Sequence, residues 1–401
     1  MTMMKAYART AADSGEVRLL DVPLPNIGRD EVRVQVHAFG VGIHDRSFIP
    51  RGVAFPYPIG TEGAGTVAEL GPQVTGVAVG DRVMFTTSLQ PQGGAWAEYA
   101  AVRSDALVPL PAGLTFAQGA ALPVAGKAAL ESLNALGLRR GQTLFVAGAS
   151  GAIGSLVIGL AAAQGVRVAG SASAGNHAYM RGLGLELAVD YHEAEWPQQV
   201  RAWAGGGLDA ALAIQPGTGS DSLKTVRDGG RVVTVSGDSA QVTPERGSTV
   251  QQIGHSPATQ AKFAELVNSI ASGDIGLVIE NEYPFAEALA ALKKTETRHA
   301  RGSPWWCWTD AHRPRALFAL PPAVGPQQQP VHTLVPPDLP VGRTEHLGVG
   351  GAAAAAATVR LQGQRVRGRV VAPRATRRLL APEPAVMLGL VRAVKLCPVS
   401  S

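Results

Sequence analysis

Three glycines spaced three residues apart form the pattern in this chain with the clearest chemical use. Gly148, Gly151 and Gly154 follow the apolar run TLFVA and open a helix-like stretch. Glycine lets a chain turn sharply and approach a pyrophosphate, and a helix starting there points N–H groups and a positive dipole end at the phosphates. The pattern predicts a dinucleotide-binding turn; the alternative is a tight strand–helix turn without a ligand. The expected cofactor contacts are Gly148, Ser150, Gly151, Ala152, Ile153 and Gly154.

The end of the next strand indicates which dinucleotide is bound. Enzymes that prefer NAD usually carry Asp or Glu there for the ribose 2′-hydroxyl. The sequence GSASAGNH has no carboxylate, and Ser171, Ser173 and His177 could accommodate a 2′-phosphate. This predicts NADPH as cofactor, although no Lys or Arg stands at the strand end, which leaves use of NADH open. Further expected cofactor contacts are Tyr191 beside the adenosine, and Ser236 and Gly237 beside the nicotinamide.

The elements that must position these residues change character along the chain. Residues 1–118 contain short strand-like runs such as EVRVQVHAFG between Gly, Pro and Asp turns, which indicates a tightly turned β-barrel. Residues 119–255 alternate apolar strands with helices, as in a doubly wound parallel sheet. Residues 256–302 return to helix, strand and helix. The predicted fold class is therefore α/β, with a β-rich domain and a nucleotide-binding domain.

Composition excludes several classes of function. The first 302 residues contain no cysteine, which rules out a thiolate nucleophile, a Cys-rich zinc site and disulfides there. Residues 303–401 hold 12 basic and 4 acidic side chains, and the remaining residues hold 24 basic and 27 acidic ones. The basic excess thus lies in the tail, and we expect no nucleic-acid partner. Without a membrane span or an N-terminal targeting pattern, we expect a cytoplasmic protein.

Several segments together resemble the medium-chain dehydrogenase/reductase superfamily. They are EVRVQVHAFGVGIHDRSF, PYPIGTEGAGTVAELGPQVTGVAVGDRVMF, GGAWAEYAAV, GAALPVAG and the glycine turn, within residues 3–302. The resemblance implies a GroES-like β-barrel catalytic domain, a Rossmann domain and a homodimer. Zinc members carry Cys and His at positions that match Gly42 and Thr61 here, so the metal would lack its ligands. We therefore expect no metal.

Zinc-free members of that superfamily resemble quinone and enone reductases. The implied reaction is hydride transfer from NADPH to a quinone or an activated alkene, a small-molecule electron acceptor. An alcohol dehydrogenase, an enoyl reductase and a non-catalytic NADP(H)-binding sensor stay open as alternatives. His44 and Asp45 are the catalytic candidates, because imidazole titrates near neutrality, or they form a structural pair. Phe48, Tyr57 and Trp96 line an acceptor pocket or belong to the core.

The sequence leaves the family pattern after Gly302. SPWWCWTD follows, and then a tail rich in proline, alanine and arginine to residue 401. One interpretation is a genuine disordered extension. The other is a frameshift: loss of one base from codons for Lys-Pro-Val-Val-Val-Leu-Asp and a stop can give these eight residues. On that hypothesis, residues 303–401 are an aberrant tail whose first residues replace a valine-rich strand or still occupy it.

Overall fold

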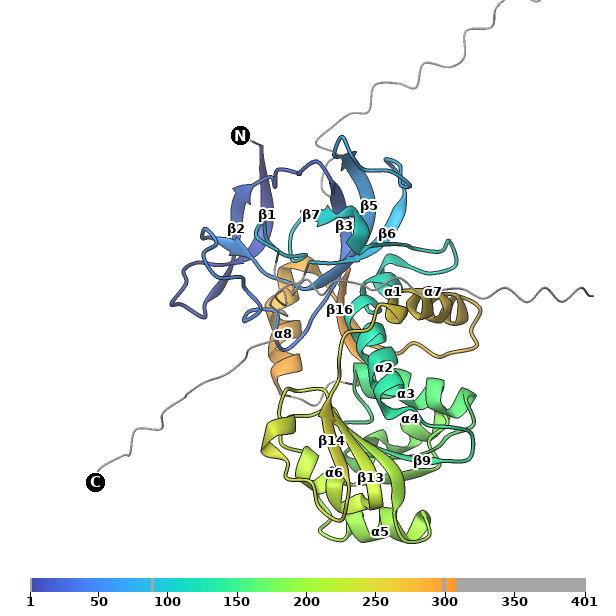
Figure 1. Ribbon diagram of the computed structural model, residues 1–401. Coiled ribbons are helices and arrows are strands. Elements are labelled where there is room, and N and C mark those ends of the chain that lie inside the picture. The colour runs from blue at the N-terminus through green and yellow to red at the C-terminus, as the bar shows by residue number, and fades with distance from the viewer. Residues whose placement is uncertain (1, 88–89, 298–300, 308–401) are drawn as a thin grey trace, which may run out of the picture. The chain divides into compact units, whose positions relative to one another are not determined.

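The computed structural model describes residues 2–87, 90–297 and 301–307 (Figure 1). In these ranges, seven strands form a barrel-like sheet in the order β15-β16-β3-β5-β6-β8, with β7 paired to β3. The strands are β3 (Glu31–Gly40), β5 (Glu62–Leu70), β6 (Arg82–Thr86), β7 (Tyr99–Arg103), β8 (Leu107–Pro109), β15 (Ile279–Tyr283) and β16 (Ser303–Cys307). A second sheet joins β1 (Met3–Arg9), β2 (Val17–Pro23) and β4 (Tyr57–Pro58).

Apolar residues at every second position explain why β3 can lie in the middle of the larger sheet with one face in the core. Val32, Val34 and Val36 of β3 are buried in the same cluster as Trp96. Gly65 of β5 must be glycine, because a Cβ there would lie 2.0 Å from the Gln35 carbonyl oxygen. The close approach of β3 and β5 therefore explains one of the glycines that punctuate this part of the sequence.

The second unit of structure is a parallel sheet, as the alternating pattern predicts. Six strands in the described residues follow the order β11-β10-β9-β12-β13-β14, and every pairing is parallel. The apolar strand β9 lies centrally, with all five residues buried. The strands are β9 (Thr143–Ala147), β10 (Arg167–Ser171), β11 (Leu187–Val189), β12 (Leu208–Ala213), β13 (Val226–Thr234) and β14 (Thr249–Gln252).

Helices cover this sheet and connect it to the barrel. Phe263, Leu266 and Ile270 of α7 share a core with α2 and α3, whereas Phe285 and Leu292, before and in α8, pack on the barrel core. The chain after β14 is therefore divided between the two cores. The α-helices are α1 (Phe116–Ala120), α2 (Pro123–Leu136), α3 (Ala152–Ala163), α4 (His177–Gly182), α5 (Trp196–Trp203), α6 (Gly219–Thr225), α7 (Ala258–Ala271) and α8 (Ala288–Glu296).

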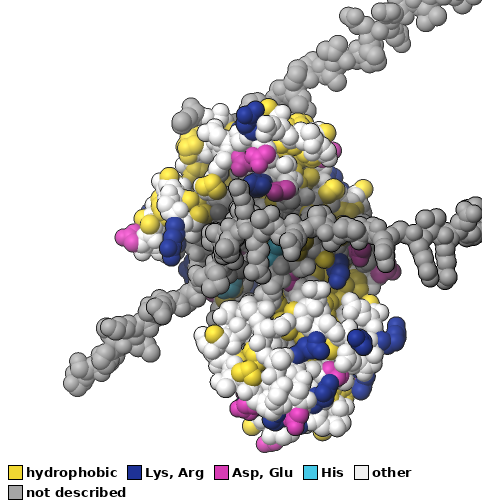
Figure 2. All heavy atoms as spheres, in the orientation of Figure 1, with side chains coloured by type: hydrophobic (Ala, Val, Ile, Leu, Met, Phe, Trp, Pro, Cys, Tyr) yellow, Lys and Arg dark blue, Asp and Glu magenta, His cyan; other side chains and the backbone are white. Residues whose placement is uncertain are grey.

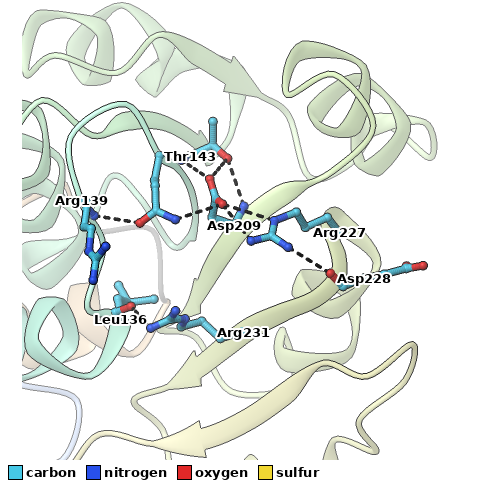
Figure 3. Close-up of polar contacts among 8 residues, drawn as sticks. Leu136, Arg139, Thr143, Asp209, Arg227, Asp228 and Arg231 are labelled. Carbon is cyan, nitrogen blue, oxygen red and sulfur yellow. Dashed lines mark hydrogen bonds and ion pairs between the residues drawn. The ribbon is translucent and has the colours of Figure 1, made fainter.

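A polar network fixes the amino-terminal edge of the parallel sheet (Figure 3). The Asp209 carboxylate in β12 accepts hydrogen bonds from the backbone N–H (2.8 Å) and the hydroxyl (3.0 Å) of Thr143 in β9. Arg227 of β13 donates to the same carboxylate at 3.3 Å. Burial opposes ionisation of Asp209, yet these bonds outweigh it and lower its pKa. The network ties three strand starts together and leaves the opposite edge to the predicted ligand.

Residues 303–307 form strand β16 despite the unusual sequence. Its backbone pairs antiparallel with β3, with Trp305 opposite Gly40 and Cys307 opposite Ala38, and parallel with β15. The frameshift hypothesis allows that these residues still occupy the final strand, and they do so. The predicted disorder of the tail concerns residues 308–401, which lie outside the described residues.

Candidate active site

The carboxyl ends of four parallel strands meet at one edge of the sheet. Ala147 of β9 is in register with Ser171 of β10 and Ala213 of β12, and Ala213 is in register with Thr234 of β13. Ligands of open parallel sheets bind outside such carboxyl ends. The segments after β9, β10, β11 and β13 carry the residues that the sequence predicts to bind the cofactor.

The glycine turn after β9 depends on glycine at Gly148 and Gly154 and leaves space at Gly151. Gly148 has φ +84°, which favours glycine, and a Cβ on Gly154 would lie 2.5 Å from the Gly148 carbonyl oxygen. Gly151 precedes α3, and its nearest neighbour to an added Cβ is 3.6 Å away. The space beside Gly151 is therefore free of close protein contacts, and the first N–H groups of α3, including those of Ala152 and Ile153, have no acceptor within the helix.

The loop after β10 is held by its own polar groups. The carbonyl of Ser171, a buried residue, accepts a 3.2 Å bond from the N–H of Ala149 in the glycine turn. His177 Nε2 lies 3.2 Å from the Ala172 carbonyl oxygen, so the ring folds back onto the strand end. The Ser173 hydroxyl accepts a 3.4 Å bond from Asn176. Tyr191, after β11, is 44% exposed.

The loop after β13 is tied to the loop after β12. The Ser236 hydroxyl donates to Asp238 Oδ1 at 3.0 Å, and the Gly217 N–H donates to Asp238 Oδ2 at 2.8 Å. Gly237 has φ +82°, with nothing within 4 Å of an added Cβ. Asp238 thus orients the segment that the sequence predicts to face the nicotinamide.

Two residues at this edge come from a distant part of the sequence, and sequence reasoning assigned them no role. The Gly302 N–H donates to the Ser150 carbonyl oxygen at 2.9 Å, and Gly302 forms an isolated bridge with Gly151. Arg301 Nε donates to Asn176 Oδ1 at 2.8 Å. Arg301 and Asn176 are 125 residues apart, so only the tertiary fold brings them together. In the sequence, the one sign of Arg301 was that it directly precedes Gly302, the last glycine of the family-like region.

In the barrel, Asp45 organises the turn that follows β3. Its side chain is 1% exposed and accepts bonds from the Gly42 N–H at 2.6 Å and the Thr61 hydroxyl at 2.8 Å. Burial raises its pKa to about 6, although these bonds pull it down. His44 lies on the exposed side of the same turn, with its ring 5.7 Å from that of Phe48. The two catalytic candidates therefore face different surroundings.

Glu62 is a second carboxyl group beside Asp45. It begins β5, and its Oε2 accepts a 2.7 Å bond from the Val124 N–H in the first turn of α2. Burial raises the pKa of Glu62 to about 8; the bond to Val124 and the charge of Lys127 lower it, and the charge of Asp45 raises it further. Burial also lowers the pKa of Lys127. Asp45, Glu62 and Lys127 thus form one electrostatically coupled group where the turn after β3 lies near α2.

The aromatic pocket candidates lie at different depths. Trp96 is completely buried, stacks on Phe39 and donates from Nε1 to the Gly40 carbonyl oxygen at 3.0 Å. Tyr57 is also buried, and its hydroxyl donates to the Gln90 carbonyl oxygen at 2.6 Å. These contacts match the alternative in which both residues belong to the core. Phe48 is partly exposed beside His44, so the proposal of an acceptor pocket rests on Phe48.

Comparison with known proteins supplies the family. Residues 28–112 match the alcohol dehydrogenase GroES-like domain, and residues 183–303 match the zinc-binding dehydrogenase family. A 2-methylene-furan-3-one reductase from Solanum lycopersicum is 30% identical over 316 residues, covering 75% of this chain and 78% of the relative. The chain belongs to the medium-chain dehydrogenase/reductase superfamily. It is an oxidoreductase of the quinone- and enone-reductase-like kind within that pyridine-nucleotide-dependent superfamily.

Other relatives agree with this assignment. A quinone oxidoreductase from Pseudomonas aeruginosa is 30% identical over 297 residues and is covered to 90% of its length, against 69% of this chain. The structure of a quinone oxidoreductase from Coxiella burnetii aligns with TM-score 0.68 at 25% identity, covering 77% of this chain and all of the other. A mycobacterial protein in complex with NADPH aligns with TM-score 0.67 at 26% identity, covering 76% and 99%.

The residues at the family's zinc positions do not suit the metal. Gly42 has no side chain, and the Thr61 hydroxyl is engaged with Asp45. Zinc in catalytic sites takes sulfur, imidazole or carboxylate ligands. Within the described ranges, no group of three or more His, Cys, Asp or Glu side chains could hold a metal ion. In those same ranges, no helix is both long and apolar enough to cross a membrane.

Proposed function

We propose that this protein is an NADPH-dependent reductase of quinones or activated alkenes that works without zinc. The observation that carries the proposal is the glycine turn at the carboxyl edge of the sheet, where Gly151 leaves room beside the start of α3. The names of the relatives, a furanone reductase and quinone oxidoreductases, support the class of acceptor.

The loop after β10 supports NADPH over NADH. Asp190, the acidic residue after β11, is engaged with the Ala174 N–H at 3.0 Å and with His192 at 2.7 Å. Ser171 and Ser173, at the end of β10, carry no charge that would repel a 2′-phosphate. We further propose that Tyr191 and His177 border the adenosine, and that Ser236 and Gly237 border the nicotinamide.

The barrel side of the site holds the acceptor. NADPH, when bound, supplies a hydride to an electron-poor carbon of the acceptor. The protein's own contribution is to orient the acceptor and to stabilise the negative charge that develops on its oxygen. We propose that His44, which is exposed beside Phe48, donates a hydrogen bond or proton there. Asp45 supports the turn through its bonds to Gly42 and Thr61.

The decisive experiment is a screen of the full chain with NADPH and NADH against quinones, alkenals, enones and simple ketones. We expect NADPH oxidation with a quinone or an enone, unaffected by a zinc chelator. A simple ketone as the preferred acceptor would point instead to an alcohol dehydrogenase. Tight NADPH binding without turnover of any acceptor would favour a non-catalytic sensor, and absence of binding would reject the cofactor proposal.

Assembly and location are also proposals. Strand β14 lies at the edge of the parallel sheet, and no strand in the described residues covers its outer side. A second copy could pair there about a two-fold axis, which would form the homodimer. Light scattering after size exclusion tests this assembly, and imaging of the tagged chain tests a cytoplasmic location. We also propose domain limits near residues 118, 255 and 302.

Nucleic acid is not among the proposed partners. On the face in Figure 2, acidic side chains lie among the basic ones over the described residues. A nucleic-acid-binding surface would present a continuous basic patch. Retention of a chain ending at Cys307 on a heparin or DNA column at physiological salt would contradict this expectation.

A further inference from the structure

The Arg301 side chain reaches the loop after β10 from a distant part of the sequence. Its Nε donates to Asn176 Oδ1 at 2.8 Å, and its Nη2 donates to the Gly175 carbonyl oxygen at 3.2 Å. The guanidinium carbon also lies 5.4 Å from the centre of the Tyr179 ring. Three contacts therefore hold one cation against a loop that contains no Lys or Arg between Ser171 and Met180.

Among the described residues, the acceptors that hold this guanidinium are neutral groups and not carboxylates. In the described ranges, no ion pair is formed by the Arg301 side chain, and both of its hydrogen-bond acceptors are neutral. The neighbouring acid, Glu280, accepts a 3.0 Å bond from the Arg301 backbone N–H and lies 3.6 Å from Lys294. A partly buried guanidinium that forms no ion pair in those ranges, and that still has N–H groups beyond the two already donated, is suited to an anion.

The position of Arg301 indicates which anion. Asn176, its acceptor, donates to the hydroxyls of Ser150 in the glycine turn and Ser173 at the strand end, both at 3.4 Å. The next residue, Gly302, donates to the Ser150 carbonyl oxygen. Arg301 is thus anchored beside the pyrophosphate turn, but its side chain contacts the loop after β10. In nucleotide-binding sheets, that loop faces the ribose 2′ position.

We propose that Arg301 binds the 2′-phosphate of NADPH and thereby sets the preference for NADPH over NADH. The inference rests on the proposed function, because it assumes a dinucleotide at the carboxyl edge of the sheet. It differs from the usual arrangement in which the cation belongs to the loop itself. Here the segment between α8 and β16 supplies the cation, while the loop supplies neutral hydroxyls and an amide.

Binding measurements on the full chain without an acceptor test the proposal. Arg301→Gln should weaken NADPH binding by about tenfold to a hundredfold, because a charged hydrogen bond to phosphate is lost, and should leave NADH binding unchanged. Arg301→Lys should retain part of the affinity, because the charge remains but the planar fork is lost. Arg181→Gln is the matched control: it removes a nearby exposed Arg of α4 and should leave both affinities unchanged.

Smaller ligands distinguish binding of the 2′-phosphate from binding of the pyrophosphate. Adenosine 2′,5′-bisphosphate should compete with NADPH for the wild type and lose this ability in Arg301→Gln, whereas ADP should compete equally with both. Equal loss of NADPH and NADH would overturn the proposal and assign Arg301 to the pyrophosphate, and unchanged NADPH binding would also overturn it. Failure of the wild type to bind either dinucleotide would reject the proposed function itself. An unchanged thermal melting curve shows that the variant folds.

Discussion

The hydroxyl of Thr61 donates a 2.8 Å hydrogen bond to the buried carboxylate of Asp45. Thr61 and Gly42 stand where zinc members of the superfamily carry metal ligands, and Asp45 binds both positions directly. Hydrogen bonds around one carboxylate thus connect two segments of the barrel at this point. This arrangement makes Thr61 a structural partner of Asp45.

Removing the Thr61 hydroxyl should therefore destabilise the fold. Thr61→Val leaves a buried carboxylate with one donor fewer, which we expect to cost about 1–3 kcal/mol of unfolding free energy. Thr61→Ser keeps the hydroxyl and should cost less. Urea denaturation measures both differences. Equal stability of the Val variant and the wild type would show that the bond contributes nothing.

Glu62 should make stability depend on pH. Burial raises its pKa to about 8 in the folded chain, from an ordinary value of 4.5. The folded state therefore holds a proton that the unfolded state releases, so this contribution is complete below about pH 4.5 and is lost as pH rises through 8. Around pH 7, one unit above the pKa of Asp45, the free energy of unfolding should fall by about 1.2 kcal/mol per pH unit, and this slope should be roughly halved at pH 8.

Glu62→Gln isolates this effect. The amide oxygen can still accept the bond from Val124, but the side chain no longer titrates, so most of the fall between pH 7 and 8 should disappear. Glu186→Gln is the control, because it removes an exposed carboxylate paired with Arg167. Denaturant midpoints at several pH values provide the measurement. A slope that persists in Glu62→Gln would assign the proton to another group.

The glycine turn offers a variant that separates binding from folding. At Gly151 an added Cβ meets nothing closer than 3.6 Å, whereas at Gly154 it meets backbone at 2.5 Å. Gly151→Val should therefore keep the fold and abolish NADPH binding by filling the space for the pyrophosphate. Gly154→Val should lower the melting temperature as well. Fluorescence titration with NADPH, beside thermal melts, distinguishes the two, and retained binding by Gly151→Val would contradict the placement of the cofactor.

The exposed ring of His44 gives a catalytic prediction. His44→Gln should lower kcat by about a hundredfold or more if the imidazole acts as general acid, and should leave NADPH binding unchanged. The control is Asp45→Asn, for which we expect mainly lower stability. A His44→Gln variant with wild-type kcat would assign the proton donor elsewhere.

Local patterns were sufficient for most of the fold. The run TLFVA forms the buried strand β9, and the glycine turn leads into α3, because backbone conformation there depends on neighbouring residues. The final strand was harder to anticipate. Residues 303–307 follow no family pattern, yet their backbone completes the sheet between β15 and β3.

The site was less predictable because its parts converge from distant segments. Ser171 and Ser173 could be proposed by counting from Gly148, since they lie at the end of the next strand of one β–α–β unit. Arg301 could not, because its contact with Asn176 depends on the return of the chain after α8. The bond between Glu62 and Val124 likewise depends on how α2 meets the barrel. Pairings of this kind have no local signature.

The residues that the frameshift hypothesis concerns, 303–307, form strand β16. We propose that the gene lost one base near codon 303 and that the backbone of β16 retains the ancestral pairing. Sequencing that region again tests the origin of the tail. A reproducible reading frame with no restorable valine-rich ending would reject it.

Truncation tests what the strand does for the cofactor site. A chain ending at Gly302 lacks β16, so β3 loses a neighbour and Gly302 is no longer held in the sheet beside Ser150. We expect it to be less stable by several kcal/mol and to bind NADPH more weakly. A chain ending at Asp310, or one in which Lys-Pro-Val-Val-Val-Leu-Asp follows Gly302, should match or exceed the full chain in both respects. Melting curves and NADPH titrations compare the three, and equal behaviour of the Gly302 truncation would show that β16 is dispensable.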